Sequence, residues 1–258
     1  MGTSDNYIIA CRLASYGKFQ DRAWSHLPEI GIRLIEMPVP AIGEHKDVKK
    51  RLADHGLHVS SFQALCDVSK PEAVEIMRPQ LETCHAFGVQ ICFLSAKAGE
   101  TDKSAVYKRL EAIGDEAGKL GVTVAMETHP DLITNGDIAY QTMNAIDHPH
   151  VRVNFDTANI YYYNQGRTAV GELAKIIDEV ISVHLKDTSG GYQEWNFPVL
   201  GTGVVDFPHI FQMLAARGFT GPYTMELEGT KGIERDEVAQ LQYVADSASY
   251  LRTLGVLG

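Results

Sequence analysis

Several features are scarce or missing in this sequence of 258 residues, and each absence removes a class of protein. Only four cysteines occur, at Cys11, Cys66, Cys84 and Cys92, and no two form a Cys-x-x-Cys pair, which argues against a zinc knuckle and a disulfide framework. No run approaches the roughly 18 apolar residues that span a bilayer, and residues 1–6 lack the basic and apolar regions of a leader. We therefore expect a cytoplasmic protein without a membrane partner.

Positive charge is also in short supply. The sequence holds 23 Lys and Arg against 33 Asp and Glu, a formal net charge of −10, which repels a phosphate backbone unless a basic patch compensates. The densest basic cluster, residues 46–51, has the pattern of the exposed face of a short helix. The sequence therefore predicts no nucleic-acid partner.

Hydrophobic residues make up 45% of the sequence, which is typical of a globular chain with a substantial core.

Eight short apolar runs rich in β-branched residues recur along the chain. Their length, and the glycine just ahead of five of them, favour strands over segments of buried helix. The runs cover residues 7–11, 33–37, 57–62, 89–94, 122–127, 151–156, 180–185 and 222–227.

Segments with helical periodicity separate these runs. The clearest cover residues 71–87, 101–120, 207–217 and 236–254. Pro71 near one helix start, and Gly88, Gly121 and Gly218 near three ends, agree with this assignment. Eight strands separated by helices require a parallel sheet, and that number closes most easily into a single (β/α)8 TIM barrel, one domain over residues 1–258. An open doubly wound sheet is the alternative, but no Gly-x-Gly-x-x-Gly follows the first run.

Four of the later runs end in a side chain that can bind a metal. Glu127, Asp156, His184 and Glu226 fall on the fifth to eighth predicted strands, whose C-terminal ends form the catalytic face of a β/α barrel. Each alone could cap a helix or pair with a lysine. Together, three acids in one barrel mouth would be strongly unfavourable without a cation. The set predicts one divalent ion, with manganese, magnesium, cobalt and zinc all suited to oxygen and imidazole ligands.

The order Glu, Asp, His, Glu resembles the sugar phosphate isomerase/epimerase family, the xylose-isomerase-like barrels. The motifs that carry the resemblance are Glu127-Thr128-His129-Pro130, Asp156-Thr157, His184-Leu185-Lys186-Asp187 and the segments 200–207 and 221–226. The resemblance implies that Glu127, Asp156, His184 and Glu226 bind one divalent ion, for which we favour manganese. It also implies that Glu127 and Glu226 are catalytic and move protons on opposite faces of the substrate.

The sequence departs from many epimerases of this family at two places. Asn159 stands where they carry a histidine after the Asp-Thr pair, and no arginine occurs between His184 and Arg217. Asn159 can hydrogen-bond a hydroxyl group but cannot carry a proton near neutral pH. The departures leave the metal ligands in place and favour an alternative in which a related substrate undergoes elimination.

Four further residues are candidates for substrate binding. His129 either faces substrate or bonds to the backbone of its loop, Asn159 can bond a hydroxyl, and Lys186 either binds a substrate oxygen or balances Asp187. Trp195 lies in the glycine-hinged, aromatic stretch 188–198, whose composition is typical of a loop that covers an active site.

Other residues near the strand ends have two possible roles each. Glu36 and Gln63 could line the barrel mouth or cap helices, and the tyrosines of 161–163 could form an aromatic wall or a contact in a homo-oligomer.

The sequence predicts a divalent-metal-dependent sugar isomerase or epimerase that acts on a ketose or keto-sugar through an enediolate. The first alternative is a metal-dependent lyase or dehydratase of a keto-inositol or keto-glycoside. A nuclease resembling endonuclease IV is a remote alternative, because it needs more metal ligands and a basic surface. A third class is a sugar-binding barrel without activity.

Overall fold

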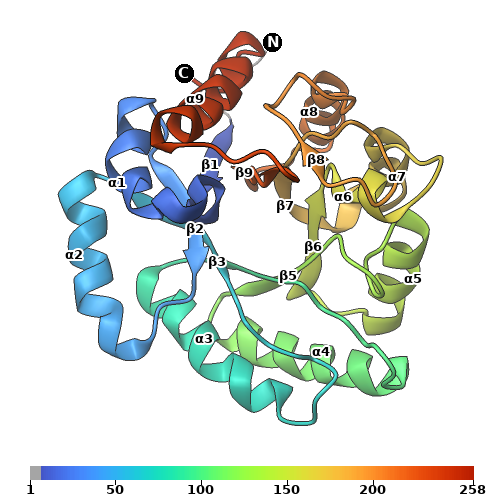
Figure 1. The fold of residues 1–258 in the computed structure, drawn as a ribbon. Helices are drawn as coiled ribbons and strands as arrows, with labels where there is room; N and C mark the ends of the chain where they lie inside the picture. Colours follow the sequence, from blue (N-terminus) through green and yellow to red (C-terminus); the bar gives the residue numbers. More distant parts are fainter. Residues whose placement is uncertain (1–6) are drawn as a thin grey trace.

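The centre of the molecule is a closed barrel of eight parallel strands surrounded by helices (Figure 1). This computed structural model describes residues 7–258. Neighbouring strands follow chain order, and the last barrel strand returns to pair with the first. The barrel strands are β1 (Ile8–Arg12), β2 (Leu34–Pro38), β3 (His58–Gln63), β4 (Ile91–Leu94), β5 (Thr123–Glu127), β6 (Val151–Asp156), β7 (Val180–Leu185) and β9 (Pro222–Met225). The structure confirms the predicted (β/α)8 TIM barrel.

The observed barrel strands match the eight predicted runs to within two residues at each end. The reason is burial on both faces: in β6, every residue except Arg152 is buried, as expected for a parallel strand covered by helices outside and by side chains inside. The sequence missed two very short strands, β8 (Asn196–Phe197) and β10 (Gly229–Thr230), which pair antiparallel outside the barrel.

Helices fill the connections between the strands. The four clearest sequence predictions correspond to α3, α4, α8 and α9, although α3 begins at Ala73 rather than Pro71. Gly88 ends α3 in the left-handed conformation (φ +70°), which glycine adopts without steric cost. The helices are α1 (Gln20–Glu29), α2 (His45–His55), α3 (Ala73–Phe87), α4 (Lys103–Lys119), α5 (Gly136–Ile146), α6 (Asn159–Tyr163), α7 (Ala169–Ile176), α8 (Phe207–Ala216) and α9 (Glu237–Thr253), with 3-10 turns at Leu13–Phe19, Ile42–Glu44 and Ile177–Glu179.

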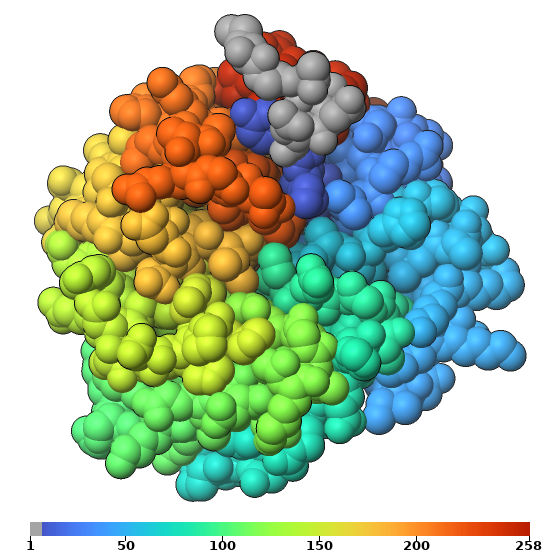
Figure 2. Space-filling model, turned by 180° about the vertical axis from the view of Figure 1, so that it is seen from behind, coloured from blue at the N-terminus to red at the C-terminus, as the bar shows by residue number. Residues whose placement is uncertain are grey.

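The chain runs once around the barrel, so its first and last elements meet. From behind, the colours pass round the molecule in sequence order (Figure 2). The amide of Gln240 in α9 donates a hydrogen bond of 2.7 Å to the carbonyl of Ser15, just after β1. The closing helix is therefore tied to the first β/α loop.

The described residues add three observations about the chain as a whole. All four cysteines are unpaired, and burial raises the pKa of the Cys11 thiol to about 12. Between residues 7 and 258, no helix combines the length and the apolar character needed to cross a membrane. The predicted single domain includes residues 1–6, which lie outside the described part of the chain, so its boundaries stay a prediction.

Candidate metal centre and active site

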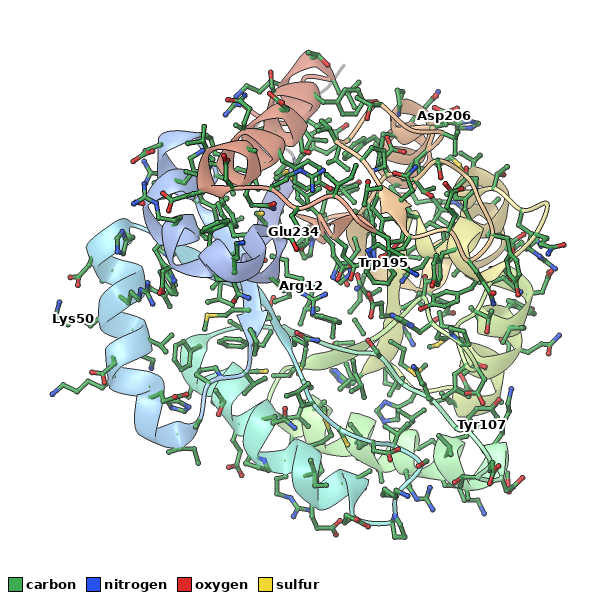
Figure 3. All side chains as sticks on the ribbon, in the orientation of Figure 1. Arg12, Lys50, Tyr107, Trp195, Asp206 and Glu234 are labelled. Carbon is green, nitrogen blue, oxygen red and sulfur yellow. The ribbon has the colours of Figure 1, made fainter. Side chains whose placement is uncertain are left out.

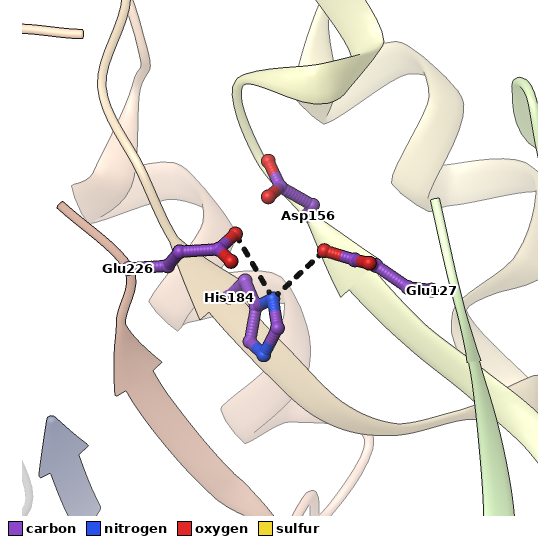
Figure 4. A group of neighbouring side chains, drawn as sticks. All are labelled: Glu127, Asp156, His184 and Glu226. Carbon is purple, nitrogen blue, oxygen red and sulfur yellow. Dashed lines mark hydrogen bonds and ion pairs between the residues drawn. The ribbon is translucent and has the colours of Figure 1, made fainter. Parts of the chain in front are cut away.

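Four polar side chains meet at the C-terminal mouth of the barrel (Figure 4). Glu127 and Asp156 end β5 and β6, His184 is the penultimate residue of β7, and Glu226 directly follows β9. Each offers one ligand atom, and these four atoms lie within 4.8 Å of one another. All four residues are buried, with exposures of 3% or less. The structure thus brings together the four residues that the sequence predicted as ligands.

The geometry of this ligand cluster, Glu127, Asp156, His184 and Glu226, fits a divalent ion. His184 Nδ1 lies 3.2 Å from Glu127 Oε1 and 3.2 Å from Glu226 Oε2, which approach from opposite sides (Figure 4). Asp156 Oδ2 and Glu226 Oε2 are buried, and both lie within 2.9 Å of the Lys186 ammonium group. Burying several carboxylates together is unfavourable unless cations face them, and oxygen with imidazole nitrogen is a donor set that divalent ions accept.

The backbone fixes Asp156 so that one oxygen points into the cluster. Its Oδ1 accepts hydrogen bonds of 2.8 Å from the backbone N–H groups of Ala158 and Asn159, at the start of α6. These two bonds leave Oδ2 directed at the cluster, where it lies 2.9 Å from Lys186 Nζ.

Glu36 lies behind His184, on the side away from the other ligands. His184 Nε2 is 3.1 Å from Glu36 Oε1, and Ser61 donates a 2.7 Å hydrogen bond to Glu36 Oε2. A proton on Nε2 directed at Glu36 leaves Nδ1 free to bind a metal, an arrangement common behind metal-binding histidines. Glu36 therefore lines the barrel interior rather than capping a helix.

The carboxylates around His184 change its protonation in the metal-free protein. Burial lowers the pKa of His184, but Glu36 and Glu127 outweigh burial and raise this pKa to about 9. In the absence of an ion, a proton on His184 therefore supplies positive charge to the cluster.

Glu127 and Glu226 have different surroundings. Glu127 Oε2 accepts a short hydrogen bond from Ser95 and lies 3.3 Å from His129 Nε2. Burial raises the pKa of Glu127, but hydrogen bonds from His129 and His184 outweigh it and hold this pKa well below its usual value. Glu226, by contrast, contacts two cations, Arg12 and Lys186.

Arg12, which sequence reasoning missed, reaches the site from the end of β1. Its guanidinium group contacts Glu226 Oε1 and donates a 2.7 Å hydrogen bond to the side-chain oxygen of Gln63. Gln63 thus lines the interior as well. The chain has no arginine between His184 and Arg217, yet an arginine does enter the mouth from the first strand. The strand-end rule applied to the first run would have found it.

Lys186 is buried among carboxylates. Its Nζ lies 2.9 Å from Asp156 Oδ2, 2.8 Å from Glu226 Oε2 and 2.8 Å from Glu228 Oε2. Burial lowers the pKa of Lys186, but Asp156 and Glu228 outweigh it and raise this pKa above its usual value. Lys186 faces the interior as predicted, and its ion-pair partners are these three acids rather than Asp187.

Asp187 instead organises the loop that follows the predicted lid. Its carboxylate accepts hydrogen bonds from the backbone N–H groups of Gly201, Gly203 and Val205, at 2.9, 2.8 and 3.2 Å. A Cβ atom at Gly203 would lie 2.3 Å from Asp187 Oδ1, so only glycine permits this close approach.

A cavity of about 200 Å³ opens onto the ligand cluster, and we call it the inner cavity. All four residues predicted to bind substrate line it, together with six that the prediction did not include. The predicted residues are His129, Asn159, Lys186 and Trp195, and the others are Arg12, Ser95, Tyr162, Tyr163, Phe197 and Glu228. A larger cavity, of about 760 Å³, lies at the opposite end of the barrel, lined by strand starts such as Ile8. Active sites of β/α barrels lie at the C-terminal end, so the smaller cavity is the candidate site.

Contacts within the inner cavity show what three of the predicted residues bond to in the folded chain. His129 Nδ1 lies 2.9 Å from the hydroxyl of Tyr163, so this histidine bonds to a side chain rather than to its loop backbone. Asn159 donates a 3.0 Å hydrogen bond to the carbonyl of Thr128 and accepts one of 3.3 Å from Lys186. Tyr162 forms an aromatic wall with Trp195, their ring centroids 5.9 Å apart.

The stretch 188–198 borders the inner cavity, as predicted for a covering loop. Trp195 and Phe197 line the cavity, and Figure 3 shows Trp195 near the centre of the barrel. The end of the stretch is held by the β8 and β10 pairing, and the Lys231 N–H donates a 2.9 Å hydrogen bond to the Trp195 carbonyl.

The fold and the site define a (β/α)8 barrel with a cluster of potential metal ligands at its mouth. A model of the xylose isomerase-like TIM barrel family matches residues 25–254, and the chain belongs to this family. This confirms the resemblance derived from the strand-end motifs.

Known proteins and structures resemble the chain over different lengths. An L-ribulose-5-phosphate 3-epimerase of Salmonella typhimurium is 27% identical over 168 residues, 62% of this chain and 58% of the relative. A xylose isomerase-like TIM barrel protein of Mycobacterium smegmatis, solved in complex with magnesium, has a TM-score of 0.79 and 18% identity over 99% of both chains. A 3-keto-D-glucoside 4-epimerase of E. coli has a TM-score of 0.74 and 18% identity over 96% of this chain and 99% of that chain. At 18% identity, the similarity to each of these two structures shows a shared fold only.

Proposed function

We propose that the protein is a divalent-metal-dependent sugar isomerase or epimerase that acts on a ketose or keto-sugar. The observation that carries this proposal is the pair of buried glutamates, Glu127 and Glu226, which approach His184 Nδ1 from opposite sides. A substrate held between them would present one face to each carboxylate. The names of the epimerase relative and of the keto-glucoside epimerase support the same reaction class.

Glu127, Asp156, His184 and Glu226 would hold one ion, for which manganese is our first candidate. The magnesium complex of the structurally similar barrel supports a divalent cation in such a fold. When bound, the ion would polarise the substrate carbonyl and stabilise the negative charge of the enediolate.

The two glutamates would transfer the carbon-bound proton. One carboxylate removes it, and the other returns a proton to the opposite face in epimerisation, whereas return to the neighbouring carbon gives isomerisation. Asn159 cannot carry a proton near neutral pH, so this work falls to Glu127 and Glu226. His129, Lys186 and Trp195 would orient the sugar within the inner cavity.

Exchange of the carbon-bound proton with deuterated water tests the proposal. We expect wild-type protein loaded with Mn²⁺ to exchange this proton in at least one ketose or keto-sugar. Glu127→Gln and Glu226→Gln should lose most turnover, at least about a hundredfold, and retain more of their metal affinity. In epimerisation the two variants should differ in which isomer still exchanges.

Glu172→Gln is a matched control, because Glu172 is a buried glutamate outside the mouth whose partners are Arg167 and Lys175. If the sugar exchanges its carbon-bound proton and loses a β-substituent, and no isomerised sugar is formed, the lyase alternative is supported. Wild-type rates in both cluster variants would reject the proposal.

We further propose a small sugar as the partner rather than nucleic acid or membrane. The net charge of −10 opposes binding to nucleic acid, and the four-residue ligand cluster is smaller than a clustered-metal nuclease needs. A single domain over residues 1–258, a cytoplasmic location and a homo-oligomer stay predictions.

A further inference from the structure

A second cavity adjoins the inner cavity at the barrel mouth, and we call it the outer cavity. Its volume is about 360 Å³, and it lies between the loop after β1 and the segment that connects β9 to α9. Four residues line both cavities: Arg12, Trp195, Glu226 and Glu228. Figure 3 shows Arg12 and Trp195 near the middle of the barrel. The two cavities are therefore neighbours, and these four residues form the lining that they share.

The two volumes leave room at the barrel mouth for more than one sugar ring. Sites for small molecules commonly measure roughly 300 to 1,000 Å³. The inner cavity, at about 200 Å³, falls below this range, whereas the two cavities together fall within it. A substrate that occupied only the inner cavity would leave the larger space beside it unused.

The wall of the outer cavity carries exposed apolar side chains. Trp195 is 39% exposed and Ile233 is 58% exposed, and both line this cavity. Aromatic and aliphatic side chains pack well against the flat apolar face of a ring, and exposed apolar surface at a cavity often marks a binding site. The outer cavity is thus suited to a ring with an apolar face.

The charges of the outer cavity oppose a phosphate group. Two arginines, Arg12 and Arg235, face two glutamates, Glu226 and Glu228, so the formal charges of these lining residues cancel. Arg12 is already engaged with Glu226 and Gln63. Phosphate is usually bound by several unpaired cationic or backbone donors, and Arg235 alone would be left to supply them.

We propose that the outer cavity binds the second ring of a keto-glycoside, a keto-sugar joined to an uncharged sugar or aromatic group. The keto-sugar would occupy the inner cavity between Glu127 and Glu226, so this inference rests on the proposed function for the choice of sugar. Trp195 and Ile233 would contact the second ring.

The test compares methyl and phenyl 3-keto-D-glucosides, which differ only in the group that would enter the outer cavity. Binding to Mn²⁺-loaded protein is measured by calorimetry, and proton exchange by magnetic resonance. We expect wild-type protein to bind the phenyl compound about tenfold more tightly. Ile233→Ala should remove most of this preference. Val238→Ala should retain it, because Val238 is a 78% exposed apolar residue in the first turn of α9 that lines neither cavity.

The outcomes separate this inference from the proposed function. A phenyl preference in binding that depends on Ile233, with no proton exchange in any sugar, would leave the outer cavity assigned and reject the proposed function. Exchange with equal affinity for both glucosides would overturn the inference alone. A preference for L-ribulose 5-phosphate over L-ribulose that is lost in Arg235→Gln would also overturn it, in favour of a phosphate site.

Discussion

Glu36 affects the site chiefly through His184, whose Nε2 lies 3.1 Å from its carboxylate, whereas Arg12 Nε is 3.9 Å away. We predict that Glu36→Gln weakens Mn²⁺ binding about tenfold and that Glu36→Ala weakens it about a hundredfold, since glutamine can still accept the Nε2 hydrogen bond but lacks the charge. Calorimetric titration measures both affinities. The imidazole pKa of His184, followed by magnetic resonance in the metal-free protein, should also fall in Glu36→Gln.

Glu172→Gln serves as the control for a buried glutamate away from the barrel mouth. Its Mn²⁺ affinity should equal that of the wild type. An unchanged affinity in Glu36→Ala would mean that the orientation of His184 does not depend on Glu36.

Protonation of His184 predicts how metal uptake depends on pH. Burial lowers the pKa of His184 and the carboxylates of Glu36 and Glu127 raise it to about 9, so below this pH an ion at Nδ1 must displace a proton. The apparent affinity for Mn²⁺ should therefore rise with pH, by about tenfold per unit, and level off above pH 9. Calorimetry in buffers of different ionisation enthalpy should detect about one proton released.

The same shift affects the stability of the metal-free protein. The raised pKa of His184 adds stability that is fully present below its ordinary value of 6.5 and is lost as pH rises through about 9. The prediction on metal uptake has its own contrary outcome. If the protein binds the metal at pH 7 without releasing a proton, His184 is neutral before the ion binds.

At the residue scale, the sequence was sufficient to predict side chains that lie at the C-terminal end of a strand. Glu127, Asp156, His184 and Glu226 each close an apolar run, and this local pattern was sufficient to place them at the mouth. The same pattern also marks Arg12, directly after the first run, but its contact with Glu226 spans 214 residues and could not be predicted locally. Only the pairing of β1 with β9 brings the two together.

Among the structural elements, the loop of residues 200–205 directs three of its backbone N–H groups at one carboxylate, that of Asp187. We predict that Asp187→Asn lowers the free energy of unfolding by about 2 to 3 kcal/mol, because the amide would direct N–H groups at backbone donors that now bond to a buried carboxylate. Denaturant unfolding measures this change. Hydrogen exchange of the Gly201 and Gly203 amides should rise at the same time.

Asp236→Asn is the matched control for that substitution. Asp236 caps α9 by accepting a hydrogen bond from the Ala239 N–H, and asparagine caps helices about as well. Its stability should change by less than about 0.5 kcal/mol. A similar small effect in Asp187→Asn would show that the loop is held by other contacts.

The long elements could be predicted from the sequence, and the shortest could not. Helices such as α4 and strands such as β6 carry a periodic pattern over many residues. Strands β8 and β10 have two residues each, too few to show alternation. They exist because the segments after β7 and β9, which are neighbouring barrel strands, bring Asn196 and Thr230 together. Their pairing depends on the barrel and is therefore absent from the local sequence.

For the molecule as a whole, occupation of the ligand cluster should govern thermal stability. An ion that binds only the folded chain adds about 2.7 kcal/mol at a concentration a hundredfold above its dissociation constant. For a chain of this size, this corresponds to a rise in Tm of about 5 to 10 °C. Calorimetry with Mn²⁺ and with a chelator measures the shift, and Asp156→Ala should abolish it. An equal shift in that variant would place the binding ion elsewhere.

The pairing of β9 with β1 also has a consequence for the time at which the protein would acquire the proposed ion. Glu127, Asp156 and His184 are synthesised well before Glu226, which directly follows the strand that closes the barrel. Arg12, the partner of Glu226, is among the first residues made. A nascent chain therefore holds an incomplete cluster until residue 226 has left the ribosome and the first strand has found the last. With the proposed ion, cation capture would be a late event in biogenesis that marks the chains whose barrel has closed.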